Sequence, residues 1–458
     1  MVERQDMVDV VIAGGGMGGL SAAIAAAERG VKVLVLEKSG AIGGNAALSA
    51  GMLLGTDDYE SLHRYIPDGD PALQRMLCAE TFEAIDWLAG QGLPIGTPQG
   101  HGGFRVSRPM ELGEAGHRTP FLAAMAERAR TAGAEIVCDA PVTALQRYGA
   151  IVAVEAGASV RRRYEARAVV LATGGFQANR KLIARFIGED AAKTLRLRSR
   201  PEAVGDGLTL ALEAGAATSR NMDKFYGHSM IDCPLPPTHF QKLTPYFARA
   251  AVLLNRDGRR FVDESDTFIE EGNAQAACRQ WGGVFYVVFD QRMYESDRAP
   301  GGTAQRSVTG DWLDMVAPFA PPLWTADTLD GLIAELARDG LQAATVKDEI
   351  ERYNRACRDG TATKLAPPRT ENAWPLEVPP FRAVRCVPGI TATSGGIAVD
   401  ESLRVLDPSR APLPGLFAAG VDAGGVYGRT YSGFLGWSLV SGRRAGRSAA
   451  AYVGNKGN

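Results

Sequence analysis

The chain has 458 residues, of which 45% are hydrophobic and 22% are charged, a composition typical of globular proteins with two or three domains. Its formal net charge of −2 at pH 7 excludes a strongly basic chain, so we expect no nucleic-acid partner. No apolar stretch approaches the ~20 residues of a transmembrane helix, and charged residues precede the first strand directly. We therefore expect a cytoplasmic protein with no membrane span. The six cysteines stand singly, which indicates reduced thiols and no metal site.

The first predicted element is an apolar strand over residues 9–13 that runs into the pattern G-x-G-x-x-G at Gly14, Gly16 and Gly19. Such glycines let a strand turn tightly into a helix and let the backbone approach a pyrophosphate at the helix N-terminus. A helix over residues 20–29 and a strand over 31–36 follow, and the strand ends at Glu37. An acid about 20 residues after the glycines is placed to accept hydrogen bonds from ribose hydroxyls. This order of elements predicts a dinucleotide site.

Further strands are predicted over residues 134–138, 150–155 and 168–171, and the last of them ends in the turn that begins at Ala172. A similar apolar segment over 415–419 ends at Gly420. In open α/β sheets, ligands bind at the carboxyl ends of the strands. Both turns are therefore expected at the same edge as the glycine-rich turn.

Between residues 224 and 361 the pattern changes to proline-rich stretches and two helices, over 328–338 with Asp327 as its cap and over 341–358. The spacing of Val346, Ile350 and Tyr353 is typical of an amphipathic helix. An alanine-rich helix over 445–451 is expected to close the fold.

Seven segments together resemble the fumarate reductase and succinate dehydrogenase flavoprotein superfamily, in the family's order and over essentially the whole chain. They are residues 14–19, 37–38, 42–46, 172–176, 205–207, 255–264 and 416–420. The resemblance implies an α/β fold, with a Rossmann-like FAD-binding domain and an inserted α+β capping domain. The boundaries that follow are 1–223 for the first part of the FAD-binding domain, 224–361 for the cap and 362–458 for the return segment.

The resemblance also implies FAD contacts: Glu37 with the adenosine ribose, Asn45 with the pyrophosphate, Asp206 and Asp422 with the ribityl chain, and Ser438 with Leu439 under the flavin. Turn chemistry and helix capping are the alternative reading of these residues. The full set expected at the cofactor is Gly14, Gly15, Gly16, Gly18, Gly19, Glu37, Lys38, Gly44, Asn45, Ala46, Gly51, Val142, Ala172, Thr173, Gly174, Asp206, Gly420, Asp422, Ser438 and Leu439. Succinate dehydrogenases bond the flavin through a histidine, and residues 43–51 contain none, so FAD is expected to bind noncovalently.

The substrate side departs from the dicarboxylate enzymes of this superfamily. Phe268 stands where fumarate reductases carry a proton-donating arginine, and phenylalanine cannot transfer a proton. Residues 392–396 lack the carboxylate-binding histidine, and Tyr431 replaces a second arginine. A doubly charged substrate would lose much of its charge-assisted binding. Fumarate reduction by the family mechanism is therefore not expected.

The segment Thr430-Tyr431-Ser432-Gly433 is more similar to the T-Y-P-G element of 3-ketosteroid dehydrogenases, in which the tyrosine hydroxyl holds the substrate ketone. The resemblance implies this role for Tyr431, while a structural tyrosine beside glycine is the alternative.

The proton acceptor is expected at Tyr226 or His228, in a segment that aligns with the family's Q-x-H-P stretch. Histidine titrates near neutral pH, and a tyrosine beside a cation or histidine can act as a tyrosinate. The alternative for His228 is a satisfied histidine at the edge of the cap, and Tyr246 and His239 are weaker candidates. Arg429 and Arg108 are expected partners for a substrate carboxylate.

These features predict an FAD-dependent dehydrogenase, or desaturase, that introduces a C=C bond next to the carbonyl of a cyclic ketone or 3-ketosteroid-like substrate. The catalytic residues would be Tyr431, Tyr226, His228 and Arg429. An α-proton would be abstracted and a β-hydride transferred to flavin N5, with an electron acceptor that the sequence does not identify. The alternatives are an ene reductase, a tricarballylate-type dehydrogenase and a flavin-binding electron carrier without substrate chemistry.

Overall fold

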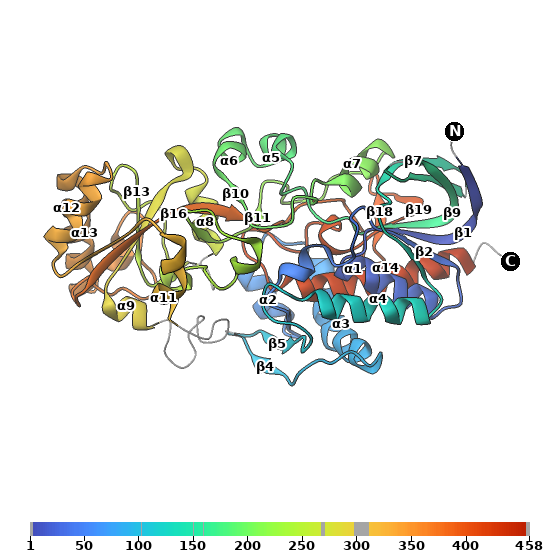
Figure 1. Cartoon of the computed structure of the whole chain (residues 1–458), viewed down its shortest axis with the longest axis horizontal. Helices are drawn as coiled ribbons and strands as arrows, with labels where there is room; N and C mark the ends of the chain where they lie inside the picture. The colour runs from blue at the N-terminus through green and yellow to red at the C-terminus, as the bar shows by residue number, and fades with distance from the viewer. Residues whose placement is uncertain are drawn as a thin grey trace. The chain divides into compact units, whose positions relative to one another are not determined.

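The computed structural model describes residues 3–101, 103–149, 151–158, 160–266, 271–296 and 311–454. The chain divides into two compact units (Figure 1). Unit 1 comprises residues 1–182, 199–225 and 392–458, and unit 2 comprises residues 183–198 and 226–391.

A parallel sheet forms the centre of unit 1. Its strand order is β18-β19-β9-β1-β2-β6, and all neighbours are parallel except β18 and β19. The strands β1 and β2 contain continuous runs of buried apolar residues, as expected where helices cover both faces of a parallel sheet. The bounds are β1 (Glu3–Ala13), β2 (Val33–Leu36), β6 (Glu135–Val137), β9 (Arg162–Leu171), β18 (Arg404–Leu406) and β19 (Pro412–Ala418), with the antiparallel strands β7 (Val142–Tyr148) and β8 (Ile151–Ala156) added beside β9.

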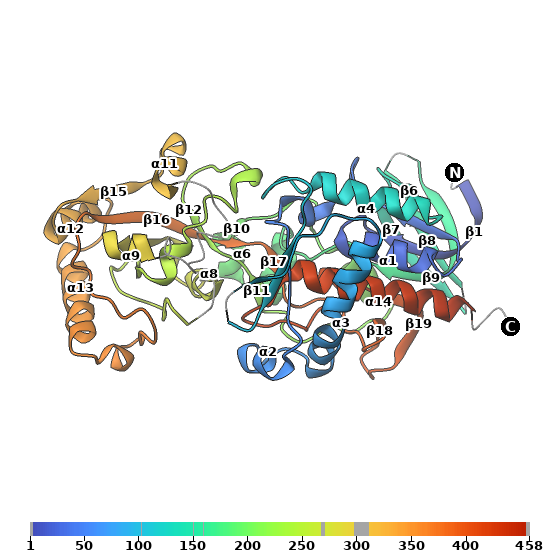
Figure 2. The same ribbon diagram turned by 90° about the horizontal axis from the view of Figure 1, so that it is seen from below.

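Helices α1 (Met17–Ala27) and α14 (Phe434–Gly454) lie side by side in Figures 1 and 2. Glycines permit their close approach, because a Cβ at Gly442 would stand 2.3 Å from the Gly18 carbonyl oxygen and one at Gly446 would stand 2.3 Å from that of Ala22. The C-terminal helix thus fixes the helix that follows the glycine-rich turn. The other regular elements of unit 1 are η1 (Gly44–Leu48), β3 (Met52–Gly55), α2 (Tyr59–Tyr65), α3 (Pro71–Gly90), β4 (Gln99–Gly100), β5 (Val106–Pro109), α4 (Thr119–Thr131), α7 (Asp206–Glu213) and η7 (Gly420–Asp422).

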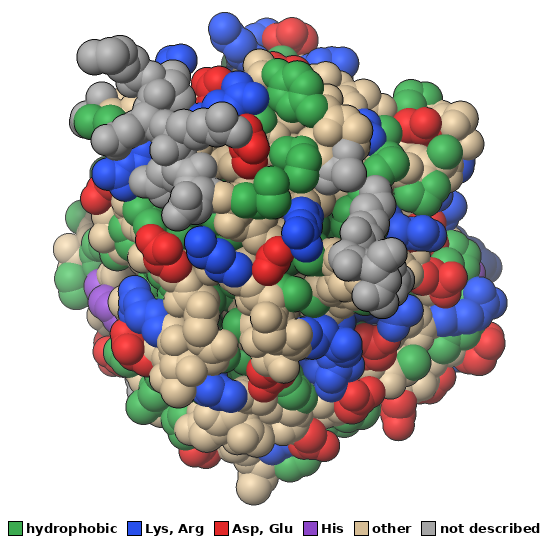
Figure 3. Space-filling model, turned by 90° about the vertical axis from the view of Figure 1, so that its right-hand side faces the viewer, with side chains coloured by type: hydrophobic (Ala, Val, Ile, Leu, Met, Phe, Trp, Pro, Cys, Tyr) green, Lys and Arg blue, Asp and Glu red, His purple; other side chains and the backbone are tan. Residues whose placement is uncertain are grey.

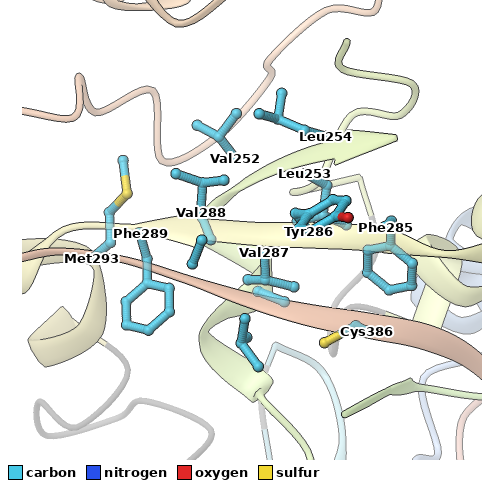
Figure 4. Packing of buried hydrophobic residues seen from close by; sticks show 14 of the residues in the cluster. Val252, Leu253, Leu254, Phe285, Tyr286, Val287, Val288, Phe289, Met293 and Cys386 are labelled. Atoms are coloured by element: carbon cyan, nitrogen blue, oxygen red, sulfur yellow. The ribbon is translucent and has the colours of Figure 1, made fainter. Parts of the chain in front are cut away.

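Unit 2 is built on a second, mostly antiparallel sheet in which β16 pairs with β10, β12, β14 and β15, and β14 pairs with β13. Apolar side chains of β13, β14 and β16 form its core (Figure 4), including Leu253, Val287 and Cys386. The strands are β10 (Arg196–Leu197), β12 (Ser229–Ile231), β13 (Val252–Asn255), β14 (Phe285–Phe289), β15 (Leu323–Ala326) and β16 (Phe381–Ile390). The helices are α6 (Glu189–Thr194), η2 (Pro237–His239), η3 (Tyr246–Arg249), α8 (Glu271–Ala277), η4 (Trp281–Gly283), α9 (Gln291–Ser296), α11 (Trp312–Val316), η5 (Ala317–Phe319), α12 (Leu329–Arg338), α13 (Ala343–Arg358) and η6 (Ala362–Lys364). In sequence, α5 (Arg180–Phe186), β11 (Phe225–Tyr226) and β17 (Ala392–Thr393) lie where the chain passes from one unit to the other.

The structure differs from the sequence expectations at one helix cap, at the start of the closing helix and at the boundaries of the units. The cap of α12 is Thr328, whose side chain accepts a hydrogen bond from the Gly331 amide, so the assignment of Asp327 as the cap was wrong. The closing helix begins at Phe434, well before the predicted 445, because buried apolar residues precede the alanine-rich run. The compact units also divide the chain at other positions than the predicted boundary at 362, because β16 pairs within the second sheet.

The segment 255–264, one of the seven that carry the family resemblance, has a structural role in unit 2. Glu264 accepts hydrogen bonds from Arg260 Nη2 at 2.6 Å and from Arg369 Nη1 at 2.9 Å, and all three side chains are fully buried. Burial alone would raise the pKa of Glu264, but Arg260 and Arg369 hold it below its usual range. Removing either partner would leave a buried charge uncompensated.

Within the described ranges, no helix is both long and apolar enough to cross a bilayer. On the face drawn in Figure 3, basic and acidic side chains are interspersed, as expected for a chain with a net charge of −2.

Candidate functional site

The glycine-rich turn joins β1 to α1 at the carboxyl edge of the sheet. Gly14 adopts a positive φ of 106°, and a Cβ there would stand 2.3 Å from the Ala172 carbonyl oxygen. A Cβ at Gly19 would stand 1.9 Å from the Gly14 carbonyl oxygen. The Ala172 amide in turn donates to the Ala13 carbonyl. Only glycine fits these contacts, and they bring the ends of β1 and β9 together as predicted.

Glu37 lies directly beneath this turn. Its two carboxylate oxygens accept hydrogen bonds from the Gly15 amide at 2.7 Å and from the Ser39 amide at 2.8 Å, and the side chain is 7% exposed. Each carboxylate oxygen can accept more than one hydrogen bond. Glu37 therefore orders the turn and retains acceptor capacity for a ribose, which stays a prediction.

Three further predicted residues are held by polar contacts within unit 1. Lys38 Nζ lies 2.7 Å from Asp206 Oδ2, and Asp206 is the first residue of α7. Asn45 Oδ1 accepts hydrogen bonds from the Ser199 hydroxyl at 2.9 Å and the Arg200 amide at 2.8 Å. The contacts of Asn45 with residues 199–200 were not foreseen, because nothing in the local sequence links these segments.

Asp422 is the most unusual of the predicted cofactor residues. Its Oδ2 accepts hydrogen bonds from the Thr173 amide at 2.5 Å and the Thr173 hydroxyl at 2.9 Å. Its Oδ1 is buried and has no hydrogen-bond partner among the described residues. Burial raises the pKa of Asp422 to about 7. A buried acceptor without a partner is costly, so the edge formed by β9 and β19 presents an oxygen that a ligand hydroxyl can satisfy.

The remaining predicted cofactor residues lie in the same unit. The Gly420 amide donates to Ser441 Oγ at 2.9 Å, and a Cβ on Gly420 would stand 3.4 Å from Ser438 Oγ. Ser441 was missed by the sequence analysis. The others lie at the N-cap of α1 and within it, on η1, before β3, at the start of β7, after β9 and on α14: Gly16, Gly18, Gly44, Ala46, Gly51, Val142, Gly174 and Leu439.

Tyr431 belongs to unit 1, where its side chain is 8% exposed. Its ring stacks with that of Phe434 and meets that of Tyr427 edge to face. The buried Arg105 donates to its carbonyl oxygen at 3.4 Å. These contacts fix the ring, while its role toward a ketone remains a prediction.

Tyr226 and His228 belong to unit 2 and are brought together as expected. The Tyr226 hydroxyl lies 2.5 Å from His228 Nε2. Tyr226 is partly exposed, whereas His228 is 0% exposed. Burial, with a contribution from the charge of Arg198, lowers the pKa of His228 well below its usual value. The expectation that His228 titrates near neutral pH was therefore wrong, because desolvation disfavours the imidazolium.

Arg198 is a residue of this neighbourhood that the sequence analysis missed. It is 2% exposed and donates to three neutral oxygens, Thr391 Oγ1 at 3.1 Å, the Phe240 carbonyl at 3.1 Å and Thr244 Oγ1 at 2.9 Å. The only signal in the sequence is the alternation of arginines at 196, 198 and 200.

The two arginines predicted to bind a substrate carboxylate, Arg108 and Arg429, contact protein groups of unit 1. Arg108 donates to Asp86 at 2.5 Å and to the Gly96 carbonyl at 3.0 Å, so its guanidinium is already engaged. Arg429 is exposed, and its amide donates to Asp68 at 3.0 Å. Phe268 lies outside the described residues.

Comparison with known proteins decides the family. Residues 9–434 match the family described as "FAD binding domain". The chain is a member of this family. The predicted cofactor is confirmed, and this flavoprotein is an FAD-dependent oxidoreductase.

Curated relatives and solved structures extend the likeness over nearly the whole chain. The flavoprotein is 28% identical to a fumarate reductase (cytochrome) of Shewanella frigidimarina, over 98% of this chain and 78% of that protein. It is 28% identical to a 4-oxocyclohexanecarboxylate 2-dehydrogenase of Sinomonas cyclohexanicum, over 97% of this chain and 93% of that protein. The solved structure of a 3-ketosteroid-Δ4-(5α)-dehydrogenase from Rhodococcus jostii RHA1 matches with a TM-score of 0.74 at 24% identity, covering 98% of each chain. The predicted superfamily and fold are confirmed.

The residues of unit 1 fit FAD. The glycines let β1 turn tightly into α1 without side chains at the helix N-terminus, the place where a pyrophosphate binds. Glu37 retains lone pairs beside the turn, and Asp422 Oδ1 is a buried acceptor without a partner among the described residues. We propose that Glu37, Asn45, Asp206 and Asp422 hold the cofactor as the sequence predicts.

We expect the purified flavoprotein to be yellow and to release intact FAD on mild denaturation. No histidine occurs in residues 43–51, so the bond that anchors flavin in succinate dehydrogenases has no partner there. Acid precipitation followed by absorbance of the supernatant and pellet measures this directly. Flavin that stays with the precipitated polypeptide would show a covalent link elsewhere.

The raised pKa of Asp422 predicts a pH dependence of stability in flavin-free protein. The folded carboxyl, with a pKa of about 7, holds its proton more tightly than the unfolded one at 3.8. Its contribution to stability is therefore complete below the unfolded pKa and is lost as pH rises through about 7. Between about pH 5 and pH 8, the free energy of unfolding should fall more in the parent than in Asp422→Asn, by on the order of 2–4 kcal/mol. The free energy of unfolding is measured by urea or thermal unfolding at each pH. An equal change with pH in the two proteins would contradict this assignment.

Proposed function

We propose that this flavoprotein is a dehydrogenase that introduces a C=C bond next to the carbonyl of a cyclic ketone. The observation that carries the proposal is the pairing, at 2.5 Å, of the hydroxyl of the partly exposed Tyr226 with Nε2 of the buried His228. A phenol held against an imidazole is a group that can exchange a proton with a substrate. The relative named 4-oxocyclohexanecarboxylate 2-dehydrogenase supports a ketone that is smaller than a steroid and carries a carboxylate.

In the proposed reaction, Tyr431 donates a hydrogen bond to the substrate carbonyl oxygen and so stabilises the negative charge of an enolate. The Tyr226–His228 pair takes the proton from the α-carbon, and the electron pair of that C–H bond passes into the enolate. Collapse of the enolate forms the C=C bond as the β-carbon loses its hydrogen with the bonding pair. FAD, when bound, supplies the acceptor for this hydride. The substrate is oxidised by two electrons, and an external acceptor must later reoxidise the flavin.

The residues that would favour a dicarboxylate are replaced in this sequence. Residues 392–396 contain no histidine, and Tyr431 is neutral where fumarate reductases carry arginine. A site without these cations would bind two carboxylates weakly. The relatives named as reductases run the same bond change in the opposite direction, so reduction of an activated C=C bond is the second candidate function.

Anaerobic mixing of the oxidised flavoprotein with a panel of compounds tests the proposal. We expect 4-oxocyclohexanecarboxylate or a related cyclic ketone to bleach the flavin absorbance, and succinate to leave it unchanged. Bleaching by succinate alone would overturn the ketone assignment. Reoxidation of chemically reduced flavin by an enone, without bleaching by any ketone, would favour the reductase. A protein that responds to no carbon compound in either direction would be an electron carrier.

A further inference from the structure

We infer that Arg198 is a positioning residue that, together with neutral His228, holds Tyr226 as its phenolate and so makes Tyr226, not His228, the proton acceptor. This inference rests on the proposed function, in which the pair receives a substrate proton. Within that pair, Tyr226 receives the proton and His228 donates a hydrogen bond to Tyr226.

Exposure separates the two residues. His228 is 0% exposed, whereas Tyr226 is partly exposed. Rings enclose the imidazole, with Tyr226 at 4.9 Å and Tyr246 at 5.5 Å between centroids, both edge to face. In the inferred arrangement the substrate meets the partly exposed Tyr226 and not the buried imidazole, so a proton enters the pair through the phenol.

Two hydrogen-bonded segments link Arg198 to this pair. On one side is the segment 389–391, where the Thr391 amide donates to the Tyr226 carbonyl at 2.8 Å while Thr391 Oγ1 accepts from Arg198 Nη1 at 3.1 Å. The Arg198 amide donates to the Ile390 carbonyl at 2.9 Å, and the Gly389 amide donates to the His228 carbonyl at 2.8 Å. The segment 389–391 thus links Arg198, which directly follows β10, to the backbone of Tyr226 and His228.

The second link is the segment 240–246. Arg198 Nη2 donates to the Phe240 carbonyl at 3.1 Å and to Thr244 Oγ1 at 2.9 Å, and Tyr246 packs its ring against His228. Arg198 and His228 therefore share neighbours on two sides. The position of the guanidinium is fixed by three hydrogen bonds, which makes its charge a stable feature of this neighbourhood.

Within the part of the chain that the structure describes, the guanidinium of Arg198 donates only to neutral acceptors. Arg198 is 2% exposed, its Nε is buried without a hydrogen-bond partner, and no carboxylate of the described residues lies within 4.0 Å of it. Taking a cation out of water without a counter-ion is costly. A negative charge on Tyr226, whose hydroxyl lies 2.5 Å from His228 Nε2, reduces that cost, whereas a positive charge on His228 increases it.

The hydrogen atom between Tyr226 and His228 can be arranged in two ways, since the donor depends on the imidazole tautomer. If the phenol donated and its proton moved to Nε2, an imidazolium would form in a fully buried place beside Arg198. Burial and Arg198 both oppose this state, and they lower the pKa of His228. If Nε2–H donates, neutral His228 stabilises the phenolate directly. A neutral phenol that donates to Nε2 would leave the charge of Arg198 uncompensated, so the surroundings favour the second arrangement. In the reaction, the α C–H bond of the substrate then breaks, its proton forms the O–H bond of Tyr226 and its electron pair stays on the substrate.

Titration of Tyr226 in the FAD-loaded protein tests the inference without any substrate. In protein carrying ¹³Cζ-labelled tyrosine, the resonance that disappears in Tyr226→Phe identifies this residue. We expect it to report ionisation at least one pH unit below the ordinary value of about 10. Burial raises the pKa of Tyr286, Tyr353 and Tyr427, so these rings should not titrate in the same range. Ionisation of Tyr226 at about 10 or above would overturn the inference.

Two substitutions of Arg198 separate its charge from its packing. Arg198→Gln should raise the midpoint of Tyr226 by about 1–2 pH units, and Arg198→Lys, which keeps the charge, should shift it by less than half as much. A merely structural Arg198 would lower the thermal unfolding midpoint in both variants and leave the Tyr226 midpoint where it is in the parent. That result would also overturn the inference. If Arg198→Gln fails to fold, the titrations of the parent and of Arg198→Lys decide.

Failure of this inference differs from failure of the proposed function. A low Tyr226 midpoint that depends on Arg198, in a protein whose flavin no ketone bleaches, would keep the phenolate and reject the ketone reaction. Bleaching by a ketone with an ordinary Tyr226 midpoint would keep the reaction and move the proton acceptor elsewhere.

Discussion

Replacement of Tyr226 by Phe should lower the rate of flavin reduction by a ketone substrate by about 10²- to 10⁴-fold, the usual contribution of a general base. The substitution removes the hydroxyl that lies 2.5 Å from His228 Nε2, on a side chain that is partly exposed. Rapid mixing under anaerobic conditions gives the rate across a range of pH. The parent should show a rise in rate as the base loses its proton, and this limb should disappear in Tyr226→Phe.

His228→Ala should have a smaller effect on the rate than Tyr226→Phe and should displace the same limb to higher pH, because it removes the donor to the phenolate but leaves the phenol. Tyr286→Phe is a matched control in the same unit, since it deletes a hydroxyl that donates to Asp339. It should reduce flavin within a few-fold of the parent rate. Solvent deuterium should enter the substrate α-carbon with the parent and with this control but not with Tyr226→Phe. If Tyr226→Phe and His228→Ala both exchange and reduce like the parent, the base is elsewhere, with Tyr246 and His239 next to examine.

Tyr431→Phe is expected to slow flavin reduction by about 10²- to 10³-fold, the typical loss when one hydrogen-bond donor to an oxyanion is removed. The effect should fall on the rate at saturating ketone, because the carbonyl oxygen gains most of its negative charge in the transition state. The pH dependence set by Tyr226 should remain. The pattern therefore distinguishes loss of a donor from loss of a base.

Tyr427→Phe is the neighbouring control for this prediction. Its hydroxyl donates to the Gly433 carbonyl at 3.0 Å within the same buried turn, so the change should lower stability with little effect on the reduction rate. Equal rates for the parent and Tyr431→Phe would make Tyr431 a packing residue, consistent with its stack on Phe434.

The sequence by itself determined the framework of unit 1. Apolar runs, glycine positions and the acid at Glu37 obey local rules, since a tight strand-to-helix turn needs glycine wherever it occurs. The turn at Gly14 and the strands on either side of it were predicted for this reason and agree with the structure in kind, with ends that differ by a few residues. The match of residues 9–434 to the family confirmed the cofactor.

The environment of each polar group was decided only by the tertiary structure. Arg198 and His228 are linked through segments 240–246 and 389–391. These segments lie far from Arg198 in sequence, so no local sequence pattern could predict that Arg198 and His228 share them. The same holds for Asn45 with Ser199 and for Thr173 with Asp422. Residue type gives a histidine or an aspartate its ordinary pKa, but burial and neighbouring charges lower the pKa of His228 and raise that of Asp422 to about 7. Desolvation and Coulomb interactions depend on which distant segments surround a group, and that information arises only when the chain is folded.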